Sequence, residues 1–159
     1  MSAEQNAALI QRFYEAFARR DAATMATCYH AEAHFSDPAF PDLRGADVSA
    51  MWTMLCERAQ DFSLSFSAIS AEGDRGQAHW EARYLFSKTG RQVHNVIDAS
   101  FVFKDGLIID HKDRFDFWRW SRMALGATGL LLGWSGFLRG KVQAEAAKGL
   151  AAFKRHRQG

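Results

Sequence analysis

The sequence predicts an α+β fold in which a curved antiparallel sheet wraps around N-terminal helices. Three apolar patterns with helical spacing occupy residues 2–19, 22–29 and 48–60. Four segments that alternate apolar and polar residues follow, over residues 62–68, 79–86, 91–103 and 107–117. A short strand over residues 33–37 separates the helices. Helices followed by a run of meandering strands are typical of α+β layers.

Each predicted helix begins at a residue that can cap it. Ser2 stands three residues before Gln5, which is the spacing of a capping box. Asp21 precedes the second helix and Asp47 the third, and an Asp side chain at such a position can accept a backbone N–H.

The rest of the chain is organised around the predicted hairpin over residues 91–118. Its strands meet at Asp105-Gly106, a strong turn signal because Gly supplies positive φ. One face of the first strand carries Val93, Ile97, Phe101 and Phe103. We expect this apolar face to pack against a second subunit in a homodimer.

Carboxylates stand among apolar residues on both strands of the hairpin. Asp98 lies between Ile97 and Ala99, and Asp113 lies two residues from His111 on the same predicted face. A buried carboxylate must be paired, neutralised or used in a cavity. We expect Asp98 to lie in a pocket, although a partner such as His94 would also explain it. A His111–Asp113 pair could hold a base near neutral pH, and the alternative is a salt link to a nearby Arg or Lys.

The composition indicates one globular domain. The chain has 159 residues, of which 48% are hydrophobic. Charge is uneven, since residues 1–117 carry 12 Lys and Arg against 17 Asp and Glu, whereas residues 118–159 carry 8 against one. We expect a cytoplasmic protein that does not bind nucleic acid. The uncharged run 123–138 is shorter than the ~20 residues that span a bilayer. We expect it to form broken helical turns that cover the pocket or clasp a second subunit, and we favour this over an interfacial membrane anchor.

A metal site is not expected. His30, Glu32 and His34 alternate in an extended segment and so share a face, but no fourth ligand is evident.

The phrases IQRFYEAFARRD, HFSDPAF and HKDRFDFW, together with the order of elements, resemble the nuclear transport factor 2-like superfamily in its SnoaL-like branch. The resemblance covers roughly residues 5–118. It implies a SnoaL-like domain over residues 1–118, with a C-terminal helical extension over residues 119–159. It also implies a cone-shaped fold around a deep apolar pocket, and commonly a homodimer.

The resemblance also assigns candidate roles. Asp37 takes the place of the general base of ketosteroid isomerases, and Asp98 that of their protonated hydrogen-bond donor. Their helix-one Tyr falls at Phe13, with Tyr14 next along the chain. Asp113 matches the last-strand acid/base Asp of limonene epoxide hydrolase and SnoaL cyclases, whereas the hydrolase's Arg and Asp on the earlier strand fall at Trp80 and Ala82. Asp37 before Pro38 would also serve merely to start a turn.

Two functions follow as hypotheses. The first is a cofactor-independent isomerase, cyclase or dehydratase that transfers protons on a small apolar molecule through the catalytic carboxyls. The second is a non-catalytic module that binds a ligand or a partner protein. For the first hypothesis the expected catalytic residues are Asp37, Asp98 and Asp113. For both, the expected pocket lining is Tyr14, Phe35, Trp52, Trp80, His94 and His111.

Overall fold

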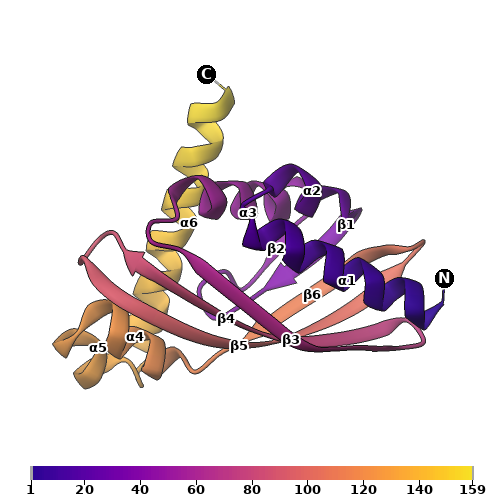
Figure 1. Cartoon of the computed structure of the whole chain (residues 1–159). Helices are drawn as coiled ribbons and strands as arrows, with labels where there is room; N and C mark the ends of the chain where they lie inside the picture. Colours follow the sequence, from indigo (N-terminus) through magenta and orange to yellow (C-terminus); the bar gives the residue numbers. More distant parts are fainter. Residues whose placement is uncertain (1, 159) are drawn as a thin grey trace.

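The computed structural model describes residues 2–158 and confirms the predicted α+β class. Helices α1 (Ala3–Ala18), α2 (Ala22–Thr27) and α3 (Ala46–Arg58) lie over the concave side of a curved six-stranded sheet (Figure 1). The sheet has the order β2-β1-β6-β5-β4-β3. Its strands are β1 (Tyr29–Ser36), β2 (Leu43–Arg44), β3 (Ser63–Glu72), β4 (Arg75–Phe86), β5 (Arg91–Lys104) and β6 (Leu107–Arg114).

Two of the three predicted helix caps are confirmed. The Gln5 backbone N–H donates to Ser2 Oγ at 3.1 Å, and the Ser2 N–H donates to Gln5 Oε1 at 3.0 Å, which completes the capping box. Asp21 Oδ1 accepts the Thr24 N–H at 3.1 Å. The prediction for Asp47 is wrong, because the N-cap of α3 is Gly45, two residues earlier, where φ is +59°.

The last strand of the chain lies inside the sheet. β6 pairs antiparallel with β5 and parallel with β1, so that Phe35 of β1 stands opposite His111. Val102 pairs with Asp110 and Phe103 with Ile108, which leaves Ile109 as a bulge. The bulge shifts the alternation by one residue, so His111 and Asp113 share the inner side with Ile108 rather than with Ile109.

The apolar face of β5 is the floor of the core. Val93, Ile97, Phe101 and Phe103 are only 2–6% exposed, and they pack within the same chain. The prediction that this face contacts a second subunit is therefore wrong. The helices of the same chain bury these side chains instead. The homodimer itself stays a prediction, without this face as its interface.

The C-terminal segment forms broken helices, as predicted. Helices α4 (Phe117–Leu125) and α5 (Ala127–Leu132) gather at one end of the sheet, and α6 (Gly136–Gln158) runs back past α3 (Figure 1). Lys154 pairs with Asp47 at 2.7 Å, and the Gln143 side chain donates to the Pro38 carbonyl at 3.0 Å. Of the helices within residues 2–158, none combines the length and apolar character that a bilayer crossing requires.

Candidate functional site

A buried histidine–aspartate pair lies on the inner side of β6. His111 Nε2 lies 2.8 Å from Asp113 Oδ1, and the side chains are 0% and 3% exposed. The bulge at Ile109 turns both of them toward the helices. A carboxylate taken out of water is costly unless donors surround it. The neighbouring side chains supply those donors.

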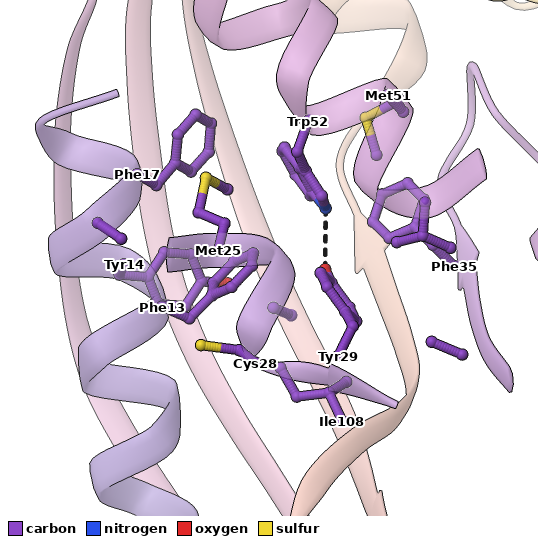
Figure 2. Packing of buried hydrophobic residues seen from close by; sticks show 14 of the residues in the cluster. Phe13, Tyr14, Phe17, Met25, Cys28, Tyr29, Phe35, Met51, Trp52 and Ile108 are labelled. Carbon is purple, nitrogen blue, oxygen red and sulfur yellow. Dashed lines mark hydrogen bonds between the residues drawn. The ribbon is translucent and has the colours of Figure 1, made fainter. Parts of the chain in front are cut away.

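A hydrogen-bonded chain of three side chains leads to Asp113. The Trp52 indole N–H donates to Tyr29 Oη at 2.8 Å (Figure 2), and Tyr29 Oη lies 2.7 Å from His111 Nδ1. Since an indole nitrogen only donates, the Tyr29 hydroxyl accepts from Trp52, and its proton is free to point at Nδ1. His111 then carries its proton on Nε2 and donates it to Asp113. Every group in the chain is satisfied with a neutral imidazole and an ionised carboxylate.

Aromatic rings enclose the imidazole of His111. The Trp52 ring stacks on it at 6.1 Å and 18°, and Phe35 meets it edge-on at 5.0 Å. Phe13 and Phe101 lie 5.7 and 4.4 Å away. These contacts fix the plane of the ring. Phe35 and Trp52, two of the predicted lining residues, therefore surround the His111–Asp113 pair.

Trp80 approaches the same oxygen of Asp113 as His111 does, and Tyr14 lies next to Trp80. The Trp80 indole N–H points at Asp113 Oδ1 from 3.4 Å, so a neutral donor stands where the resemblance places an Arg. Tyr14 is fully buried, with its ring 6.0 Å from that of Trp80. Its hydroxyl has no hydrogen-bond partner among the described residues. Burial, and then the negative charge of Asp113, raises the pKa of Tyr14 well above its usual value, so the phenol stays a donor.

Asp37 follows β1 and forms the turn that the Asp-Pro pair predicted. Its Oδ1 accepts the backbone N–H groups of Ala39 at 2.7 Å and Phe40 at 2.6 Å. Burial raises the pKa of Asp37 to about 7, against the lowering effect of these N–H groups and with a further rise from the charge of Asp113. The two backbone bonds use Oδ1 and leave Oδ2 clear of them. Asp37 thus combines the turn function with a proton that exchanges near neutral pH.

Two tyrosines of this region were missed by sequence reasoning. Strand alternation places Tyr29 on the same buried face as Ala33 and Phe35, and this was the signal in the sequence that could have identified it. Tyr84 accepts the Trp120 indole N–H at 2.8 Å. Burial raises the pKa of Tyr84 to about 12, and the charge of Asp37 also raises it. Helix α4 is thereby tied to the same end of the cone as Asp37.

Asp98 and His94 do not join this group. The Asp98 side chain is 73% exposed on the outer side of β5, where its Oδ1 lies 2.9 Å from His79 Nδ1. Glu81 bridges His79 and His94 at 3.0 and 2.7 Å. The prediction that Asp98 lies in a pocket as the acid is wrong, and so is that of His94 as pocket lining. The reason is strand alternation: both lie out of phase with Val93, Ile97 and Ala99.

The histidines of β1 pair with carboxylates: His34 has two such partners and His30 has one. His34 Nε2 lies 2.7 Å from Asp42 and its Nδ1 2.9 Å from Asp110, while His30 lies 3.8 Å from Asp105. Within residues 2–158 no three His, Cys, Asp or Glu side chains group as metal ligands.

Two hollows open on the surface. One of about 400 Å³ lies between Phe40, Leu43 and α6, and one of about 440 Å³ lies between α4 and the turn before α6. Neither is lined by Asp37 or Asp113. An apolar pocket at the carboxyls therefore stays a prediction.

Comparison with known proteins places this geometry in a family. Residues 10–111 match the family model of the SnoaL-like domain. A search of curated proteins gives no match. Among solved structures, an LEH-like epoxide hydrolase from M. tuberculosis is 17% identical, with a TM-score of 0.66 over 82% of this chain and 97% of that one. TsrD from Streptomyces laurentii is 22% identical, with a TM-score of 0.64 over 79% and 98% of the two chains. An NTF2-like protein from Burkholderia pseudomallei is 19% identical, with a TM-score of 0.66 over 78% and 98%.

At these identities the solved structures establish the fold alone. The family match spans more than half of the chain and agrees with the order of helices and strands. The chain therefore belongs to the SnoaL-like domain family.

Proposed function

We propose that the protein catalyses proton transfer on a small, largely apolar carbonyl compound, with Asp113 as the base and Asp37 as the acid. The observation that carries this proposal is the pair of unlike carboxyls at one end of the cone. Asp113 Oδ1 lies 2.8 Å from His111 Nε2 and 3.4 Å from the Trp80 indole nitrogen, whereas burial raises the pKa of Asp37 to about 7. Two carboxyls in unlike surroundings can serve as base and acid at one pH.

The chemistry follows from this difference. The Asp113 carboxylate takes a proton from the carbon next to the carbonyl, and the C–H electron pair moves into a new C=C bond. The carbonyl oxygen takes the proton of Asp37 and becomes an enol. The Tyr14 hydroxyl, which has no partner among the described residues, is a second donor of suitable type for that oxygen. Return of the proton from Asp113 to a different carbon of the conjugated enol, with the enol O–H proton going back to Asp37, completes an isomerisation. In a cyclisation the enol carbon would instead attack a second carbonyl carbon of the same molecule, whose oxygen takes the proton from Asp113 while the enol O–H proton returns to Asp37. Neither route needs a cofactor.

The test is a pH–rate profile on a panel of unsaturated ketones, with epoxides as a second panel. Because Asp37 acts as a protonated acid, we expect kcat to fall as pH rises through about 7. Asp37→Asn should abolish that dependence and lower kcat by roughly 10²-fold or more. A rate that rises through the same pH would reverse the two roles, and turnover of neither panel by the folded wild type would contradict the enzymatic proposal.

A second candidate is a non-catalytic binding module. It is favoured by the dense aromatic packing around His111, and neither of the two surface hollows is lined by Asp37 or Asp113. A ligand that binds without turnover, and whose affinity is the same in Asp113→Asn, would support this function.

A further inference from the structure

The tip formed by α5, the turn after it and the first residues of α6 exposes large apolar side chains. Within eight positions, five of them are 40–76% exposed: Leu130, Leu131, Leu132, Trp134 and Phe137. The other large hydrophobic residues exposed within residues 2–158 are Leu55 and Trp118. A contiguous apolar group of this kind marks an interaction surface.

Helix α5 is built in the reverse of the usual amphipathic pattern. Its inner side is glycine: a Cβ on Gly129 would lie 1.9 Å from the Ser121 carbonyl oxygen, and one on Gly133 would lie 2.1 Å from Ser121 Oγ. The leucines therefore point outward while the glycines allow α5 to touch α4. A soluble surface helix would place its apolar side chains inward. The arrangement holds the leucines away from the core of the domain.

The backbone of the tip needs no donors from water. The last four carbonyls of a helix normally lack partners within the helix. In α5 each of them accepts a hydrogen bond. Gly129 O accepts the Gly133 N–H at 2.8 Å, and Leu130 O accepts the Trp118 indole at 3.2 Å. Leu131 O accepts the Trp134 indole at 2.8 Å, and Leu132 O accepts the Ser135 hydroxyl at 2.5 Å. A tip with satisfied carbonyls can leave water at low cost.

Basic residues stand on both sides of the apolar tip along the sequence. Residues 117–144 contain Arg119, Arg122, Arg139 and Lys141 and no Asp or Glu. Arg122 stacks on Trp118 at 4.1 Å and Arg139 over Phe117 at 5.1 Å, which fixes both cations beside the tip. Basic side chains are attracted to the negative surface potential of an anionic membrane. A second copy of the tip would instead bring like charges together.

We propose that the tip of α5, flanked by these four basic side chains, docks on an anionic lipid surface. The leucines and Phe137 enter the boundary between headgroups and acyl chains, Trp134 lies at the level of the headgroups, and the basic residues contact lipid phosphates. The contact is peripheral and requires no spanning helix. The exposure of the leucines reverses the expectation from the sequence, which favoured a cover of the pocket or a clasp over a membrane anchor. It is independent of the proposed chemistry, since it uses neither Asp37 nor Asp113.

The test is co-sedimentation of the full chain with phosphatidylcholine vesicles, with and without phosphatidylserine. We expect binding to the phosphatidylserine vesicles that weakens as salt rises, and a blue shift of the Trp fluorescence that is lost in Trp134→Phe. Leu131→Asp should weaken binding by about tenfold or more, because a charge replaces an inserted leucine. Arg139→Glu with Lys141→Glu should remove the preference for anionic vesicles.

The matched control is Leu55→Asp, which places the same charge at an exposed leucine on α3, away from the tip. It should bind vesicles like wild type, and unchanged thermal unfolding will show that both Asp variants fold. Failure of wild type to bind either vesicle overturns the proposal, as does equal loss of binding in Leu55→Asp. A dimer that forms in solution and is lost in Leu131→Asp also overturns it, and assigns the tip to self-association.

Discussion

The hydroxyl of Tyr29 lies 2.7 Å from Nδ1 of His111, across 82 positions of the sequence. This contact decides which imidazole nitrogen carries the proton, because the Trp52 indole already donates to the same hydroxyl. The tautomer of His111 then determines that Asp113 receives a hydrogen bond. The properties of the carboxylate therefore depend on residues that contact it only indirectly.

Tyr29→Phe should remove the hydrogen bond that fixes the tautomer of His111. Removal of the hydroxyl leaves the Trp52 indole N–H and His111 Nδ1 without partners in the core. We expect a loss of about 1–3 kcal/mol in the free energy of unfolding in urea, the usual cost of an unsatisfied buried polar group. Long-range nitrogen NMR of the imidazole should show a mixture of tautomers. Tyr84→Phe is the control, because it removes a hydroxyl that is bonded to an indole but not to His111. A single, unchanged tautomer in Tyr29→Phe would show that the Tyr29 hydroxyl does not determine the tautomer of His111.

Asp37 makes stability depend on pH. Its pKa is about 7 in the folded chain and near 3.8 in the unfolded one, so the folded state binds more protons between these values. The free energy of unfolding contributed by this group therefore falls as pH rises from about 4 to about 7. Asp37→Asn lacks the ionisation. Its stability relative to wild type should increase over this window, by at most about 4 kcal/mol, in urea unfolding at a series of pH values. A constant difference would mean that the folded carboxyl titrates like an unfolded one.

Asp113→Asn and Asp98→Asn form a matched pair. The Asp113 change removes a buried charge that raises the pKa of Asp37, so Asp37 should titrate at lower pH in carbon-detected NMR of its carboxyl. Turnover should fall by roughly 10²-fold or more, since the base is lost. Asp98→Asn changes an exposed residue on the outer side of the sheet and should alter neither property. Loss of turnover in Asp98→Asn would restore it as a site residue.

Two leucines of the C-terminal segment should respond differently to replacement by Ala. Leu150 of α6 is 4% exposed and packs into the core, and Leu131 is 67% exposed. Leu150→Ala should lower the free energy of unfolding by about 2–5 kcal/mol, as a cavity-forming change does. Leu131→Ala should stay within about 0.5 kcal/mol of wild type. Equal losses in chemical denaturation would contradict the assignment of α6 to the core and of α5 to the surface.

Local patterns were sufficient to predict most elements of the fold. The capping box at Ser2, the cap at Asp21 and the turn at Asp105-Gly106 all depend on neighbours in sequence, and the structure contains each of them. The bulge at Ile109 was not predictable in this way, because it depends on how β6 pairs with β5. It decides that His111 and Asp113 face inward.

The site was predicted only in part for a similar reason. Strand alternation correctly places Asp98 and Ile97 on opposite faces of β5, but it does not predict which face is turned toward the helices. The apolar neighbours Ile97 and Ala99 led to the expectation that Asp98 is buried, but neighbours in a strand point to the opposite face. The link from Tyr29 to His111 and the effect of Asp113 on Asp37 arise from tertiary contacts, which a single sequence does not contain.

The parallel pairing of β1 with β6 has a consequence for how the molecule reaches its native state. The ladder between β1 and β6 pairs Phe35 with His111, which lies 76 positions later in the chain. The ladder therefore cannot form until β6 has been synthesised. Tyr29 and Asp37, at the two ends of β1, meet His111 and Asp113 only when the last strand enters between β1 and β5. High sequence separation of this kind slows folding. A ribosome-bound chain that ends before residue 107 would hold both helices and strands but not the paired carboxyls, so competence for proton transfer would arise in one late step.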